Sequence, residues 1–254
     1  MEFSESRRTS WSTDEAAAVY ERGRPDYAEA AVDWALEPVR DRPGLRALDL
    51  GAGTGKLTRQ LIGRGVATVA LDLSAGMLAE LARAVPAATT LLGRAEQVPL
   101  PDASIDLAVA GQAFHWFDRC RTLPELARVL RPGGVFAVLY NARDDQVSWV
   151  RALSEVIEET GDHASVALSQ EPWDLGPMFG PAEVFRAEHD QPLDVAGLLD
   201  LVGSRSYVIR MDPAERDALL GRVAELARTH PALVGRQYFS MPYVTTCQRY
   251  TLRS

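Results

Sequence analysis

Short apolar runs alternate with helix-like segments through residues 45–140, and this alternation constrains the fold more than any other feature. The segments between the runs repeat apolar residues at intervals of three and four, the period of a helix packed along one side. Strands that alternate with helices imply right-handed crossovers and a parallel sheet covered on both faces. We predict strands at 45–50, 66–71, 89–92, 105–110 and 135–140.

The pattern changes after Tyr140. Residues 147–160 and 212–229 have helical spacing, while 183–191 and 238–251 are candidate strands with poor alternation. We therefore expect one α/β domain over residues 1–254, with a doubly wound, mostly parallel seven-stranded sheet and a helical insertion that forms a lid. In this division residues 15–140 form the ligand-binding core, 141–230 the helical lid and 231–254 the final strand region.

The composition excludes several classes of protein. With 27 basic and 35 acidic residues the net charge is −8, which argues against a nucleic-acid partner. The two cysteines lack metal-ligand spacing and indicate free thiols in a reducing compartment. No secretory segment and no apolar run of the roughly 18 residues needed to span a bilayer is present. We expect a cytoplasmic protein with no metal and no membrane partner.

The segment "ALDLGAGTGKLT", residues 47–58, follows the first predicted strand and has glycines at 51, 53 and 55. In an open parallel sheet this first turn is the usual ligand cradle. Glycine allows a positive φ and lets a ligand touch the main chain. We therefore expect these glycines to clear room for a ligand.

Two common nucleotide patterns do not fit this loop. A dinucleotide fingerprint needs a glycine where Lys56 stands, and a phosphate-binding P-loop needs serine or threonine where Leu57 stands. Lys56 is expected to be a solvated residue of the first helical turn. Asp72, at the end of the second predicted strand, can accept hydrogen bonds from both hydroxyls of a ribose. Asp49, beside the loop, favours a ligand with an ammonium or sulfonium group over a pyrophosphate.

The pattern Asp-x-Gly-x-Gly-x-Gly, taken with these acids, resembles that of class I S-adenosylmethionine-dependent methyltransferases. "GRAEQVPLPDASIDLAV" at 93–109 and "ELARVLRPGGVFAV" at 125–138 are similar to later segments of that family. "YERGRPDY" at 20–27 and "FHWFD" at 114–118 resemble its small-molecule branch, methyltransferase type 11, which includes trans-aconitate methyltransferase-like proteins. The resemblance covers roughly residues 15–140. It implies a Rossmann-like methyltransferase fold, S-adenosyl-L-methionine as cofactor and a small-molecule acceptor.

The resemblance also implies the residues that bind the methionyl part of the cofactor. Asp49 would face the methionyl amino group, and Gly51, Ala52 and Gly53 would offer main-chain contact. Gln112 would lie near the transferable methyl group.

For the adenosyl part, the resemblance implies that Asp72 binds the ribose while Leu73 and Met77 pack on the adenine. The backbone N–H of Ala95 would donate to the ring, and Glu96 would accept from the exocyclic amine. Met77 also lies on an apolar helix face, where plain core packing is an equal alternative.

His115 is the candidate catalytic base, since it follows the fourth predicted strand at the carboxyl edge of the sheet. The alternative is that His115 packs within the aromatic group Phe114, Trp116 and Phe117. We expect Trp116 to contact the substrate.

The lid is expected to set acceptor specificity through "SRSY" at 204–207. Arg205 could bind a carboxylate bidentately, with Tyr207 beside it. The alternative for this stretch is a solvated helix end. Tyr20 would close the same cavity from the other side, near the cofactor.

The predicted function is methyl transfer from S-adenosylmethionine to an O-, N-, S- or C-nucleophile of a small molecule, with a carboxylate or hydroxyl among the candidates. One alternative is a module that binds S-adenosylmethionine without turnover, which would have a blocked acceptor pocket. Another is a tRNA or protein methyltransferase, which would need a basic or extended docking surface. The sequence leaves the oligomeric state open.

Overall fold

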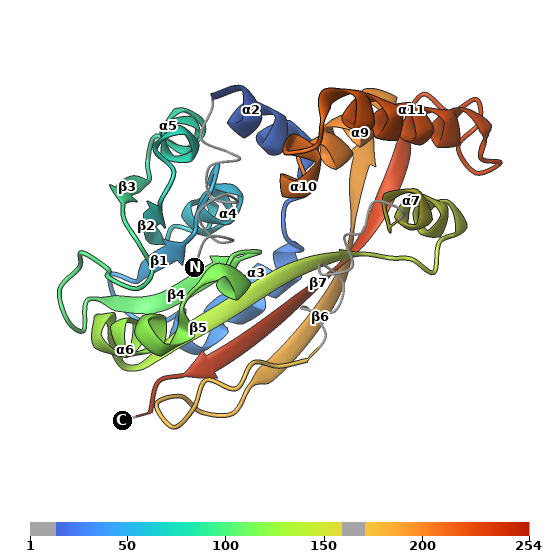
Figure 1. Cartoon of the computed structure of the whole chain (residues 1–254). Coiled ribbons are helices and arrows are strands. Elements are labelled where there is room, and N and C mark those ends of the chain that lie inside the picture. The colour runs from blue at the N-terminus through green and yellow to red at the C-terminus, as the bar shows by residue number, and fades with distance from the viewer. Residues whose placement is uncertain (1–13, 159–170, 254) are drawn as a thin grey trace.

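The computed structural model describes residues 14–158 and 171–253, which form a seven-stranded sheet in the order β3-β2-β1-β4-β5-β7-β6 (Figure 1). The strands are β1 (Arg46–Leu50), β2 (Ala67–Asp72), β3 (Thr89–Leu92), β4 (Ile105–Gly111), β5 (Leu130–Arg143), β6 (Glu183–Leu193) and β7 (Phe239–Thr251). Strands β1 to β5 pair in parallel, whereas β7 runs antiparallel to both of its neighbours, β5 and β6. The sheet is therefore mixed.

The five predicted strands of the first half are present, and both candidate strands of the second half are also real. Strand β5 begins earlier than the predicted run 135–140 because Leu130 pairs with Ile105 of β4, and it ends later because Arg143 pairs with Tyr243 of β7. The segment 141–230 is not wholly helical, since it contains β6. The candidate strand 183–191 alternates poorly in polarity because β6 is the edge strand, whose residues are exposed or half-buried except at Leu193.

Helices cover both faces of the sheet. The helices of the described residues are α2 (Asp14–Gly23), α3 (Glu29–Leu36), η2 (Glu37–Val39), α4 (Lys56–Gly63), α5 (Ala75–Ala84), η3 (Phe114–Trp116), α6 (Arg119–Val129), α7 (Ser148–Glu158), α9 (Val195–Gly203), α10 (Ser206–Ile209) and α11 (Pro213–Thr229). Successive residues of a strand point to opposite faces. Accordingly Ala47 and Leu107 pack with α3 and α4, while their neighbours Leu48 and Ala108 pack with α6.

Side-chain caps fix where several of these helices begin. Ser74 accepts a hydrogen bond from the backbone N–H of Met77 at the start of α5, and Asp194 accepts one from Gly197 at the start of α9. Such caps satisfy N–H groups that have no partner inside the helix. Helix α4 has no such side-chain cap: its N-cap residue is Gly55, whose φ of +90° turns the chain sharply after β1.

A separate apolar cluster holds the helices of the second half together. Helices α7, α9 and α11 pack there against the ends of β6 and β7, through residues such as Leu153, Leu201, Val223 and Met241. The last two residues of the predicted helix 147–160 lie outside the described residues. Figure 1 shows α9 and α10 facing α2 across the upper side of the molecule.

Candidate active site

Two adjoining cavities lie at the carboxyl ends of the parallel strands. The larger has a volume of about 620 Å³ and the smaller about 170 Å³. Seven residues line both: Tyr20, Gly51, Gly53, Gly111, Gln112, Trp116 and Phe117. The cavities therefore meet beside the glycine loop and the end of β4, at the edge where ligands bind in open α/β sheets.

The glycines of the loop serve two different purposes. All three have positive φ, +67° at Gly51, +56° at Gly53 and +90° at Gly55. A Cβ at Gly51 would lie 2.7 Å from Cβ of Ala113, and one at Gly55 would lie 2.6 Å from Cγ of Leu81. A Cβ at Gly53 would meet no heavy atom within 4 Å. The expectation that all three clear room for a ligand is thus corrected: at Gly51 and Gly55 the protein's own packing excludes a side chain.

Asp72 lies in the wall of the smaller cavity, and its carboxylate is held by the backbone. Oδ2 accepts a hydrogen bond from the N–H of Gly53 at 2.9 Å, and Oδ1 accepts one from Ser74 at 2.8 Å. Burial raises the pKa of Asp72, and these backbone N–H groups act in the opposite direction. Both oxygens keep further lone pairs for a ligand hydroxyl.

The other residues predicted for the adenosyl part surround the same small cavity. Leu73 and Met77 line it together with Ala95 and Glu96. Met77 is only 4% exposed. Its position therefore fits both alternatives, contact with an adenine and packing in the core. Oε1 of Glu96 accepts a hydrogen bond from the backbone N–H of Asp118 at 3.0 Å. This contact fixes the carboxylate at the cavity wall.

Asp49 lies in the wall of the larger cavity and is almost fully buried. Its Oδ2 accepts a hydrogen bond from Oγ1 of Thr58 at 2.6 Å. Burial raises the pKa of Asp49 to about 7, and the nearby charge of Asp72 acts in the same direction. A cation placed next to Asp49 would favour the ionised carboxylate.

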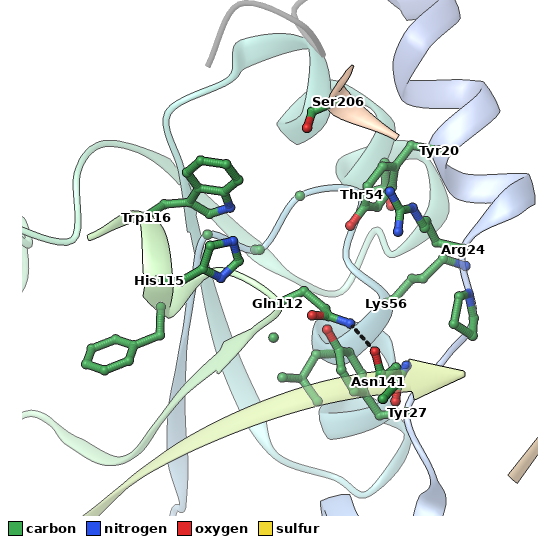
Figure 2. Close-up of a pocket in the computed structure, with 18 of the residues that line it drawn as sticks. Tyr20, Arg24, Tyr27, Thr54, Lys56, Gln112, His115, Trp116, Asn141 and Ser206 are labelled. Carbon is green, nitrogen blue, oxygen red and sulfur yellow. Dashed lines mark hydrogen bonds between the residues drawn. The ribbon is translucent and has the colours of Figure 1, made fainter. Parts of the chain in front are cut away.

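Gln112 stands where the two cavities meet, with its backbone in the left-handed region at φ +54°. Its Nε2 donates to the backbone oxygen of Asn141 at 2.9 Å, as Figure 2 shows. Asn141 in turn donates through Nδ2 to the backbone oxygen of Asp26. A strained non-glycine residue held by such contacts is typical of a functional site.

His115 and Trp116 lie on the short helix η3 and form part of the wall of the larger cavity. The centroid of the His115 ring lies 4.5 Å from that of Trp116 and 6.0 Å from that of Tyr140. Phe114 is fully buried between this cavity and the core, edge-on to Phe136. His115 therefore packs among aromatic rings and also lines the cavity, so its position fits both packing and a catalytic role.

Arg205 and Tyr207 line the larger cavity from α10 and its preceding turn. Ser204 is buried and both Arg205 and Tyr207 are half-buried, so this stretch is not a solvated helix end. Lys56 is also not solvated: its side chain is 12% exposed and lies 3.6 Å from Glu21 and 3.7 Å from Asp26. All fifteen residues predicted for the cofactor, catalysis and substrate line one or both cavities.

Sequence reasoning missed several further residues of the larger cavity, among them Arg24, Asn141, Arg143, Trp173 and Tyr243. Arg24 lies inside the quoted motif "YERGRPDY", and Arg143 and Asn141 follow the fifth predicted strand at its carboxyl end. Their positions in the sequence could therefore have marked these three residues as candidates for the site. Trp173 and Tyr243 come from a loop and an antiparallel strand, and no local pattern marks them. Across the described residues, no group of three or more His, Cys, Asp and Glu could hold a metal ion, and no helix is long and apolar enough to cross a membrane.

The sheet order and the paired cavities at the glycine loop define the class of Rossmann-like methyltransferases. A protein of Anaeromyxobacter dehalogenans assigned as a type II methyltransferase has a similar structure, with a TM-score of 0.63 and 26% identity over 91% of this chain and 97% of that one. Residues 48–138 match the family model for a methyltransferase domain.

Similarity over the full length then identifies the family. An uncharacterized methyltransferase of Mycobacterium tuberculosis is 44% identical over 246 residues, which cover 97% of this chain and 98% of that protein. A malonyl-[acyl-carrier protein] O-methyltransferase of Serratia marcescens is 45% identical over 97 residues, 37% of each chain. The chain belongs to the class I methyltransferase family and is an S-adenosylmethionine-dependent methyltransferase.

Proposed function

We propose that this enzyme transfers a methyl group from S-adenosyl-L-methionine to a small molecule held in the larger cavity. The single observation that carries the proposal is the junction of two differently lined cavities at Gly53 and Gln112. A cofactor bound across this junction would place its adenosyl part in one cavity and its reactive end in the other.

The small cavity suits an adenosine in its chemistry. Asp72 offers carboxylate oxygens to a ribose, while Leu73 and Met77 offer apolar surface to a base. The open space beside Gly53 lets a ligand approach the main chain, which any larger residue would prevent. Asp49, buried where the loop begins, would pair with the ammonium group of the methionyl part.

When bound, S-adenosylmethionine supplies an electrophilic methyl group on a sulfonium. The task of the chain is to hold the acceptor atom in line with that group, an alignment that can be worth roughly 7–11 kcal/mol. We assign Gln112 and Trp116 to this positioning, because both line the junction. His115 would accept a proton from a hydroxyl or protonated amine acceptor.

Residues 15–140 would thus bind the cofactor, and the helices within 141–230 would form the lid over the acceptor. A cavity of about 620 Å³ falls in the usual range for small-molecule sites. Its volume argues against a blocked pocket, and hence against binding without turnover. The net charge of −8 argues against a tRNA acceptor.

The presence of Arg205 in the cavity favours an acceptor with a carboxylate, as in the trans-aconitate methyltransferase-like branch. The similarity to malonyl-[acyl-carrier protein] O-methyltransferase covers only 97 residues and therefore supports cofactor handling more than acceptor choice.

Calorimetry with S-adenosylhomocysteine tests the cofactor assignment, with NAD(H) as the control ligand. We expect saturable binding of the first and none of the second. Incubation with labelled S-adenosylmethionine and a metabolite pool then tests turnover, since the methylated product identifies the acceptor. Binding of NAD(H) alone, or cofactor binding with no labelled small molecule, would contradict the proposal.

A further inference from the structure

Three arginines from distant parts of the sequence meet in the larger cavity. Arg24 follows α2, Arg143 ends β5 and Arg205 precedes α10, and all three line the same walls. The electrostatic influence of Arg205 reaches both Arg24 and Arg143. We call these three residues the arginine cluster.

Acidic partners are missing from the cluster among the residues that the structure describes. None of the three guanidinium groups lies within 4.0 Å of a carboxylate of residues 14–158 or 171–253. Buried nitrogens without a hydrogen-bond partner occur in each: Nε of Arg24, Nη1 of Arg143 and Nε of Arg205. Most other arginines here do have partners; Arg64, for example, bonds to Asp33 at 2.7 Å.

The nearby groups do not neutralise this charge. Asp145 also lines the cavity and favours the charged form of Arg143 from a distance, but it forms no ion pair with that guanidinium, and one carboxylate cannot balance three guanidiniums. Arg24 donates through Nη2 to the backbone oxygen of Ser204 at 3.3 Å, which leaves its charge uncompensated. Burial raises the pKa of Tyr243, so its phenol stays neutral and can donate a hydrogen bond.

Gathering like charges in a shielded site has a free-energy cost. Burial and the neighbouring Arg205 lower the pKa of Arg143 to about 10, which still leaves it charged at neutral pH. An uncompensated buried charge is costly, and proteins retain such groups where a ligand supplies the counter-charge. The net charge of the chain is −8, so the positive charge of the arginine cluster is opposite in sign to that of the protein as a whole.

We propose that the arginine cluster binds an acceptor carrying at least two negative charges, either a dicarboxylate or a phosphate monoester. This inference rests on the proposed function and names the acceptor class of the same site. One carboxylate satisfies one guanidinium bidentately, whereas three guanidiniums match the oxygens of a dianion. Figure 2 shows Arg24 across the pocket from His115, with Gln112 between them, so the charged end of the acceptor would lie away from His115.

Calorimetry on the full-length protein saturated with S-adenosylhomocysteine tests the proposal at constant ionic strength. Malonate, succinate and inorganic phosphate are the dianionic probes, and acetate is the monoanionic control. We expect saturable binding of at least one dianion and about tenfold weaker binding, or none, for acetate. The stronger dianion, phosphate or dicarboxylate, identifies the chemical source of the charge.

Variants localise the binding. Arg143→Gln and Arg205→Gln should each weaken dianion binding about tenfold or more, since each removes a charge-assisted contact. Arg151→Gln, an exposed position on α7, changes the net charge equally and should leave binding unchanged. Without anions, Arg143→Gln should be at least as stable as the wild type, because it removes a charge without a partner.

Three outcomes would overturn the inference: no dianion binds, the cluster variants bind dianions like the wild type, or Arg143→Gln unfolds at markedly lower temperature than Arg151→Gln. Its failure is separable from that of the proposed function. If S-adenosylhomocysteine itself does not bind, the cofactor assignment fails; if it binds and every dianion does not, only the arginine cluster is misassigned.

Discussion

Asp72 accepts a hydrogen bond from the backbone N–H of Gly53 at 2.9 Å, and this contact ties the end of β2 to the loop after β1. The other carboxylate oxygen accepts from Ser74, where α5 begins. The same side chain therefore shapes the glycine loop and faces the cavity proposed for the ribose.

Replacing Asp72 by alanine should affect both roles. Loss of two charge-assisted bonds to a ribose should weaken S-adenosylhomocysteine binding at least about tenfold. Loss of the backbone contacts should also lower the free energy of unfolding by about 1–3 kcal/mol. Calorimetry and denaturant unfolding measure the two effects, with exposed Asp41→Ala as control. Unchanged affinity would show that Asp72 is only a structural residue.

Gly53→Ala should reduce cofactor affinity more than it reduces stability. Its φ of +56° is strained for alanine, at a cost of about 1–2 kcal/mol, and the new methyl group would project into open space beside the cavity. Gly44 is a matched control, because it has φ +64°, an equally open environment and no place in either cavity. Both variants should lose similar stability in chemical unfolding. Only Gly53→Ala should bind S-adenosylhomocysteine less tightly. Equal binding by the two variants would contradict the proposed contact between the cofactor and the main chain at Gly53.

Cofactor binding should depend on pH through Asp49. Its pKa of about 7 means that the carboxyl is largely protonated at pH 5.5 and ionised at pH 8. An ammonium group binds only the ionised form strongly, so the affinity for S-adenosylhomocysteine should rise over this range. Asp49→Asn should bind more weakly and show a flat pH profile. A wild-type profile equally flat in calorimetry would place the ammonium elsewhere.

The raised pKa of Asp49 also predicts how the stability of Asp49→Asn relative to the wild type changes with pH. Because the folded pKa of Asp49 is raised, its contribution to stability is present below about pH 4 and is lost as the pH rises through about 7. Asp49→Asn should therefore gain on the wild type as pH rises, by up to about 4 kcal/mol between pH 4 and 8. Thermal unfolding of both proteins, each without ligand, measures the difference. A difference that stays constant or shrinks would contradict the raised pKa.

His115→Gln separates catalysis from packing. If the histidine accepts a proton, turnover should fall by about 10²–10⁴ while S-adenosylhomocysteine affinity stays within about twofold. His230→Gln, outside both cavities, serves as the control. The assay is product formation per folded molecule, once an acceptor is known. Normal turnover with a lowered unfolding temperature would leave His115 as a packing residue.

Gly23→Ala should loosen the contact between helices α2 and α9. A Cβ at Gly23 would lie 2.6 Å from the backbone carbonyl of Asp200, so the two elements must move apart. Overpacking of this kind costs about 1–3 kcal/mol. Gly221→Ala, at an open and exposed position of α11, should instead stabilise by about 0.4–1 kcal/mol. Thermal unfolding compares the two, and equal effects would show that α2 adapts freely.

The parallel half of the fold could be read from the sequence because its signals are local. Short apolar runs mark strands such as β1 and β4, which are buried on both faces. Ser74 caps its helix through a bond to a residue three positions away. The order Asp49, glycine loop and Asp72 likewise lies within one strand–helix–strand unit. Residues predicted there line the cavities, since short crossovers leave few other arrangements.

Tertiary structure alone decided the rest, because those features depend on partners far along the chain. The sequence offered 183–191 only as a candidate strand, and pairing with β7 makes it the edge strand β6. Gly51 is constrained by Ala113 rather than by a ligand. Arg24, Arg143 and Arg205 line one cavity only after α2, β5 and the segment from α9 to α10 have packed together. A local pattern specifies how a segment folds, whereas the charge of a cavity depends on which segments the packing brings to its walls.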